Sequence, residues 1–135
     1  MANFVFGDIL DISCNHNGTT YRFSPKANES GNLDKGGIRG NDDANQITSN
    51  GQMMRQLNRA RWMFDCPIAC DQVADYELKA LNIMAASPIL GQWSFNMISG
   101  AIYTGNGAPV GDIATDTNAG TIALKVSGNG EFLKY

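Results

Sequence analysis

The sequence has few of the side chains that carry out enzyme and metal chemistry. Its 135 residues include three cysteines and one histidine. A catalytic serine or cysteine needs a base beside it, and the single histidine, His16, falls in an expected hairpin turn. The Gly-Asn-Gly segments at 105–107 and 128–130 do not open a helix, as a dinucleotide-binding loop must. We therefore expect no enzyme activity and no cofactor.

Charge is also scarce. Charged residues make up 17% of the chain, whereas about a quarter is typical of soluble domains. This shortage predicts that partner molecules cover much of the surface. The net charge of −3 argues against a protein that grips nucleic-acid phosphates, because such a protein needs a basic face.

Long apolar runs are missing as well. No run approaches the roughly 20 residues that a membrane helix requires. The first ten residues, MANFVFGDIL, lack the basic start and the long apolar stretch of a signal peptide. We expect a protein that binds no membrane and folds, or assembles, in the cytoplasm.

The three cysteines are expected to be reduced and buried, since an odd number without an export signal is not typical of a disulfide scaffold. A metal site would have to combine Cys14 and His16 with Cys66 and Cys70. Zinc sites favour more closely spaced pairs, with a second pair elsewhere in the sequence. A small metal- or ligand-binding β-domain is therefore kept as an alternative.

Short alternating stretches dominate what the sequence does contain. Apolar residues take every second position from Trp93 to Met97 and again from Ile122 to Val126. This period of two, bordered by Gly and Asn, is typical of half-buried antiparallel strands. Asn17-Gly18 predicts a β-hairpin between two further strands. Ser99-Gly100 and the segment 128–130 are expected to be turns.

One helix is predicted from about Asp75 to Ala86. Asp75 is a plausible N-cap, and Ser87-Pro88 ends the helix. Its buried stripe is expected to consist of Leu78, Leu81, Met84 and Ala85.

Residues 25–51 are rich in Gly, Asn and Asp and contain only scattered apolar side chains. Such a long segment inside a compact domain is usually functional or disordered, so we predict a long interacting loop. After it, residues 53–69 are expected to form one long strand or two linked strands. Arg55, Arg59 and Arg61 take alternate positions there and would lie on one face of the strand. This basic stripe is either exposed to solvent or in contact with acidic residues of a neighbouring subunit.

These elements predict a single domain over residues 1–135 with a mainly β (α+β) fold. We expect a small antiparallel β-sandwich or half-barrel with one short helix and a long loop extension. In their order along the chain, the elements resemble the tail tube proteins of contractile-tailed bacteriophages. The resemblance covers nearly the whole chain and is most specific at DCPIACDQVADYELKALNIMAAS, where a strand runs through an acidic turn into a helix. It recurs in NMISGAIYTGNGAPVGDIATDTNAGTIALKVSGNGEFLKY, which is similar to the family's hairpin, Tyr-x-Gly-x-Gly segment and final strand.

The resemblance implies a structural virion protein. In that family six copies form a ring, the rings stack, and the strands of all six copies close into a tube inside a contractile sheath. The lumen conducts the genome, so DNA passes without specific binding. The implied partners are further copies of the chain, the tail sheath protein, the baseplate tube initiator, the tail terminator and the tape measure protein. A baseplate tube initiator, or the tube of a secretion or bacteriocin-like injection device, remains an alternative.

The resemblance also implies which residues make contacts. The family's long loop reaches the adjacent ring, and residues 25–51 match its position; residues 2–8 would join rings or subunits. The residues expected in contacts between subunits or rings are Phe4, Phe6, Leu33, Asp34, Arg39, Asp42, Asp43, Arg55, Arg59 and Arg61. The residues expected to face the lumen are Gln92, Ser94, Asn96, Thr121 and Lys125.

Overall fold

Most of the chain forms one large antiparallel sheet. A computed structural model describes the backbone of residues 4–134 and the side chains in that range except those of Asp42 and Glu131. Eight strands pair in the order β2, β1, β9, β10, β12, β8 and β3, with β11 beside β12. They are β1 (Ile9–His16), β2 (Thr19–Phe23), β3 (Asn32–Asp34), β8 (Trp62–Ala69), β9 (Gly91–Met97), β10 (Ile102–Pro109), β11 (Thr115–Asp116) and β12 (Thr121–Lys134). The predicted mainly β fold with one short helix is confirmed.

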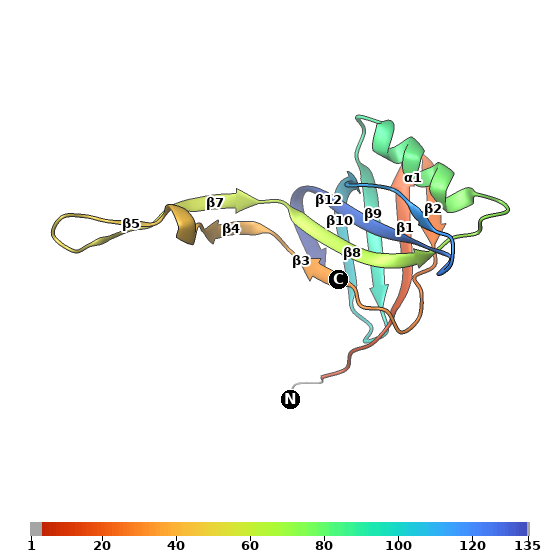
Figure 1. Ribbon diagram of the computed structural model, residues 1–135, viewed down its shortest axis with the longest axis horizontal. Helices are drawn as coiled ribbons and strands as arrows, with labels where there is room; N and C mark the ends of the chain where they lie inside the picture. The colour runs from red at the N-terminus through yellow and green to blue at the C-terminus, as the bar shows by residue number, and fades with distance from the viewer. Residues whose placement is uncertain (1–3, 135) are drawn as a thin grey trace.

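The sheet curls over its own core (Figure 1). In the sheet order, β9 and β8 are separated by β10 and β12, yet the rings of Phe95 and Phe64 stack with centroids 4.1 Å apart. Because both side chains are fully buried, the two strands face each other across one apolar core. The alternation seen in the sequence supplies this core, since Trp93, Phe95, Ile122, Leu124 and Val126 all point inward.

The curled sheet comes close to closing but does not form a barrel within the described residues. After β2 the chain crosses to the far edge, where Pro25 forms an isolated bridge with Ile68. The amide of Ala69 donates to the carbonyl of Ser24 (2.7 Å) at this crossing. Further along, β3 pairs with the other half of β8, so the crossing segment covers most of that edge strand.

The first hairpin forms as predicted, with Asn17 and Gly18 at φ 50° and 83°. Positive φ at both central residues is what a tight hairpin turn requires. His16 does not lie in the turn, because the two residues suffice to reverse the chain. It ends β1, is buried, and donates through Nε2 to the carbonyl of Ile89 (3.1 Å).

The Gly128-Asn129-Gly130 segment was expected to be a turn, and this prediction is wrong. The segment lies inside β12, where Gly128 pairs with Gly107 of β10. A Cβ atom on Gly128 would lie 1.8 Å from the carbonyl oxygen of Asn106. The glycine therefore serves a close approach of two backbones and not a chain reversal.

The helix, α1 (Tyr76–Ala86), follows Asp75 as predicted, but Asp75 does not cap it through its side chain. The residue has a left-handed conformation, with φ 56°. Leu81 and Met84 are buried as expected, and Leu78 is partly buried. Ala80 takes the place of the exposed Ala85 in the buried stripe.

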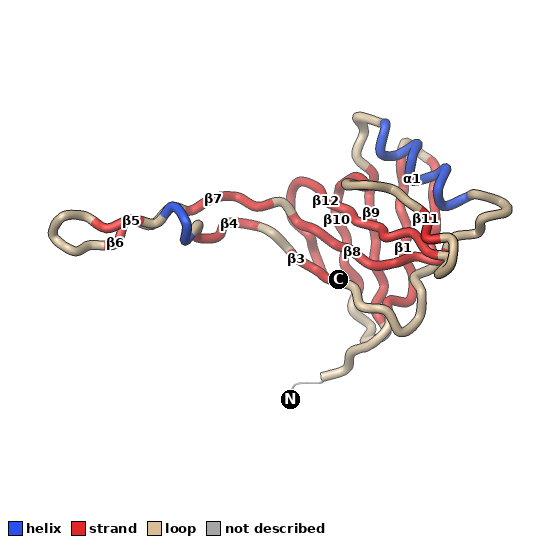
Figure 2. The backbone as a smooth tube through the Cα atoms, viewed as in Figure 1, coloured by secondary structure: helices blue, strands red, loops and turns tan. Residues whose placement is uncertain are grey.

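The predicted loop 25–51 and strand 53–69 need a larger correction. The middle of the chain forms two small two-stranded sheets that project away from the large sheet (Figure 2). Their elements are β4 (Gly37–Gly40), the short 3-10 helix η1 (Asp42–Ala44), β5 (Gln46–Ile47), β6 (Met53–Met54) and β7 (Leu57–Ala60). This hairpin could not be recognised in the sequence. Both of its faces are exposed, so its strands show no alternation of apolar and polar residues.

Replacing Leu81 with alanine should lower the free energy of unfolding by about 2–5 kcal/mol, because the fully buried side chain leaves a cavity. Ile83→Ala on the exposed side of the same helix should change it by less than about 0.5 kcal/mol. Urea denaturation of both variants measures the difference. Equal stabilities would contradict the placement of α1.

Gly128→Ala should destabilise the protein by about 1–3 kcal/mol, since the added methyl group meets the backbone of β10. Gly40→Ala is the matched control, because its methyl group would meet only the mobile end of the Arg55 side chain. We expect the control to change stability by less than about 0.5 kcal/mol in thermal denaturation. A tolerated Gly128→Ala would rule out the close approach.

Candidate intersubunit surfaces

The most distinctive surface belongs to the projecting hairpin, residues 35–61, which we call the arm. Ile38 pairs with Arg59 near its base, and Ile47 pairs with Met53 near its tip. On the strand that leads out to the tip, η1 separates β4 from β5. On the strand that returns, two residues connect β6 to β7. At about 3.3 Å per residue, the ten steps from Gly51 to Arg61 span roughly 30 Å.

The arm has no core of its own. None of its described side chains is buried, and its larger apolar residues are between 52% and 70% exposed. These residues are Ile38, Ile47, Met53, Met54 and Leu57. A two-stranded hairpin in isolation is marginally stable in water, so the arm lacks the packing that would hold it. Exposed apolar side chains gathered on such an element are typical of an interaction site.

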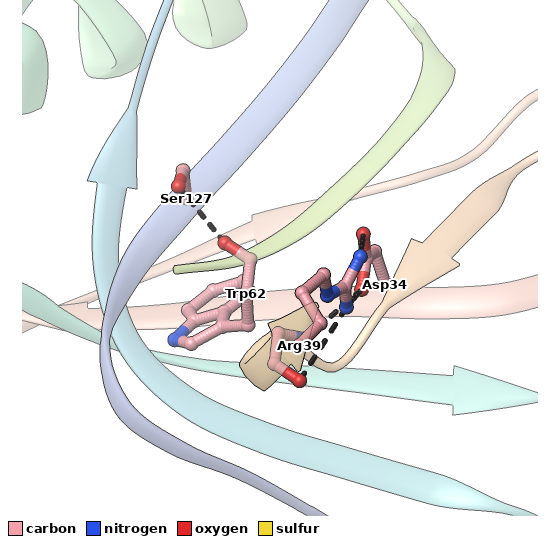
Figure 3. A network of polar contacts seen from close by, with 5 residues as sticks. Asp34, Arg39, Trp62 and Ser127 are labelled. Atoms are coloured by element: carbon pink, nitrogen blue, oxygen red, sulfur yellow. Dashed lines mark hydrogen bonds and ion pairs between the residues drawn. The ribbon is translucent and has the colours of Figure 1, made fainter. Parts of the chain in front are cut away.

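A paired carboxylate and guanidinium fix the base of the arm (Figure 3). Asp34 accepts two hydrogen bonds from Arg39, at 2.5 and 3.1 Å, and a third from the amide of Gly36 at 2.9 Å. The hydrogen bond from Arg39, followed by that from Gly36, holds the pKa of Asp34 below its ordinary value of 3.8. Asp34 and Arg39 were expected in contacts between subunits; their charges are already paired within the chain.

The other side of the base is anchored in the core by Trp62, which follows the arm directly. Its indole N–H lies 3.2 Å from the carbonyl oxygen of Asn106 and 3.3 Å from that of Asn129. Its ring stacks on Phe132 at 4.5 Å, and its own carbonyl accepts a hydrogen bond from the Ser127 hydroxyl at 2.8 Å (Figure 3). The root of the arm is therefore held firmly, although its tip makes no contact with the core.

The three arginines of the predicted basic stripe do not lie on one continuous strand. Arg55 lies between β6 and β7, Arg59 lies in β7, and Arg61 connects β7 to β8. All three are exposed, and none takes part in an ion pair between described residues. Asp43 is exposed in η1, and the side chain of the neighbouring Asp42 lies outside the described residues.

The N-terminal segment offers a second apolar surface. Phe4 and Phe6 are 89% and 90% exposed. The segment borders a cavity of about 270 Å³ whose apolar wall includes Leu33, Phe64 and Met97. Leu33, which was also expected in contacts, lines this cavity and is 37% exposed. Residues 2 and 3 of the predicted joining segment lie outside the described residues.

A third surface is the outer face of β1, β9 and β10, which carries uncharged polar residues. Ser94 lies between Ser13 and Thr104, and Gln92 lies between Asn15 and Asn106. Asn96 lies between Asp11 and Ile102 in the next row. Asp11 is within 3.8 Å of Arg22 on β2, so the two charges on this face offset each other. We call this surface the polar face.

The five residues expected to face a lumen do not share one surface. Gln92, Ser94 and Asn96 lie on the polar face. Thr121 and Lys125 are on the part of β12 that pairs with β8, on the layer opposite β9. The alternation in the sequence identified the outward positions correctly, but the curl of the sheet turns the two sets away from each other.

The thiols lie within or beside the core. Burial raises the pKa of Cys14 and of Cys66 to about 12, with a further contribution from Asp65 for Cys66. Such thiols are poor nucleophiles and poor metal ligands at neutral pH. Among residues 4–134, the structure brings together no group of three His, Cys, Asp or Glu side chains that could hold a metal ion.

The titration of Asp34 tests the base of the arm. Its lowered pKa means that the pair stabilises the folded base above the ordinary pKa and that this stabilisation is lost as the pH falls through the lowered value. Arg39→Gln should raise the titration midpoint of the Asp34 carboxyl toward 3.8, as measured by NMR of its carboxyl carbon. Arg59→Gln should leave the midpoint unchanged. An identical response to both substitutions would show that the pair does not form.

Comparison with known proteins adds no relative: no protein-family model matches the chain, and no curated protein matches its sequence. None of the described helices is long and apolar enough to span a membrane.

Proposed function

We propose that this chain is a structural subunit that assembles with copies of itself into the inner tube of a contractile phage tail. The observation that carries the proposal is the arm, a firmly rooted hairpin with exposed apolar residues and no core of its own. A hairpin of this kind gains its stability from another molecule. The role is structural, with no catalytic step and no cofactor.

Self-assembly explains several features of the surface together. Beyond the arm, Phe4 and Phe6 are almost fully exposed, and they would be covered by neighbouring copies in stacked rings. The low proportion of charged residues suits a subunit with large buried contacts, since interface centres are depleted of charge. The three arginines of the arm remain available for charge-assisted contacts with a neighbour.

The polar face suits the wall of a conduit for DNA. The side chains of Gln92, Ser94 and Asn96 can hydrogen bond to water but carry no charge that would hold phosphate groups. A duplex could then move along the wall without binding to it. In this proposal the polar face points to the lumen, whereas Thr121 and Lys125 face away from it, toward the sheath or a neighbouring subunit.

The remaining partners follow from the same resemblance. The tail sheath protein would surround the tube, and the baseplate tube initiator, tail terminator and tape measure protein would contact its ends or its lumen. A tube initiator, or the tube of a secretion or bacteriocin-like device, would use the same surfaces. Copy number separates these roles, because a tube protein is abundant in each particle and an initiator is not.

Shortening the arm tests the proposal. Residues 41–56 can be replaced by Asn-Gly, because Gly40 and Leu57 are paired and a two-residue turn can join them. We expect a variant whose stability is within about 1 kcal/mol of the wild type, since no buried side chain is removed. It should form no tubes under conditions where the wild-type protein forms them.

Sedimentation velocity and negative-stain microscopy, with and without sheath or initiator protein, provide the measurement. Tubes of normal appearance from the shortened variant would refute the role of the arm. A wild-type protein that stays monomeric under every one of these conditions would refute the proposed function as a whole.

A further inference from the structure

A cavity of about 770 Å³ lies where the root of the arm meets the outer side of β10 and β12. One side of it is formed by Arg59 and Arg61 with the arm backbone. Leu90, Ala108 and Val110 line the rest, together with residues 127–130.

The chemistry of the cavity defines its occupant. Its wall is mostly apolar, while two guanidinium groups that form no ion pair with the described residues stand at one side. A matching ligand therefore has a small apolar tip flanked by carboxylates.

A turn on the same chain has this composition. Val73, between β8 and α1, is 98% exposed, the highest value among the described large apolar residues. Asp71 holds the turn in shape by accepting hydrogen bonds from the amides of Val73 (3.0 Å) and Ala74 (3.1 Å). Asp71, Asp75 and Glu77 flank the tip, and none takes part in an ion pair between described residues. We call residues 71–75 the acidic turn.

The acidic turn lies at the end of the molecule opposite to the arm (Figure 1). The two surfaces are far apart within one copy, so a second copy must supply the match. Gln72 donates to the carbonyl of Thr117 at 3.4 Å, and the Cys70 amide donates to the carbonyl of Gly120 at 2.8 Å. These bonds place the segment that follows β11 beside the turn, and Asp116 at the end of β11 adds another carboxylate to this end.

We infer that the acidic turn of one copy inserts into the arm-root cavity of the next, with Val73 in the apolar part and the flanking carboxylates beside Arg59 and Arg61. This inference rests on the proposed self-assembly and names its contact. A head-to-tail contact of this kind is heterologous, and its repetition closes a ring or extends a filament.

Two variants test the contact from its two sides. Val73→Asp places a charge at the apolar tip without disturbing the subunit, since the side chain is 98% exposed. Arg59→Ala combined with Arg61→Ala removes the charges of the cavity. Each should raise the protein concentration needed for assembly at least about tenfold, which sedimentation velocity measures. Lys26→Ala, which removes an exposed charge on the body outside this cavity, is the matched control and should assemble close to the wild type.

Disulfide trapping tests the geometry directly in a Cys70→Ser background. A Val73→Cys copy mixed with a Leu90→Cys copy should form a disulfide-linked dimer on oxidation, because bonding requires Cα atoms within about 7 Å. Mixing it instead with an Ile98→Cys copy, whose residue lines a different cavity, should give none.

The outcomes separate the inference from the proposed function. If the cavity variant and the turn variant both assemble at the same protein concentration as the wild type, the inference is overturned. Self-assembly, and with it the proposed function, would still stand. Trapping at Ile98→Cys but not at Leu90→Cys would overturn it as well. A wild-type protein that never assembles would remove the proposed function, and the inference with it.

Discussion

The burial of Trp62 is the interaction on which the rest of the structure depends. The indole stacks on Phe132 and hydrogen bonds to two strands, β10 and β12, while its backbone carbonyl accepts a bond from Ser127. Space for the ring exists only because Gly105 and Gly107 lie against it, where a Cβ atom would come within about 3 Å of the indole. One side chain thus sets the bend of the two strands, the curl of the sheet and the packing of the aromatic core.

The same residue connects the core to the arm. Because Trp62 begins β8 directly after Arg61, the direction in which the arm leaves the body is set by the packing of the indole. On the other strand, the Asp34–Arg39 pair restrains the entry to the arm. A firmly held base combined with a tip that has no core suits an element that must meet a partner at a defined angle, since preorganisation lowers the entropy lost on binding.

Several elements could be predicted from the sequence because their own residues determine them. Trp93 and Phe95 alternate with polar residues, as in a half-buried strand. Asn17-Gly18 favours a tight turn, and the spacing of Leu81 and Met84 is helical. The arm was missed because the apolar side chains of Ile38 and Met53 are exposed and follow no period. The glycines at 128 and 130 were read as a turn, since the same residue serves chain reversal and close backbone approach. Which outward residues share a surface depends on the curl, and that depends on contacts between distant strands.

The position of the surfaces limits the kind of assembly that the chain can form. The arm root, which holds the cavity, and the acidic turn lie on opposite sides of the body, so a head-to-tail contact between two copies leaves one cavity and one turn unmatched. The ion pairs among the described residues are local and exposed, and they neutralise neither the arginines of the cavity nor the carboxylates of the turn. Every added copy would therefore present a fresh cavity and a fresh turn until the chain of contacts closes. In a tube of stacked rings, this head-to-tail contact would close each ring. The tip of the arm would then be free to connect one ring to the next along the tube.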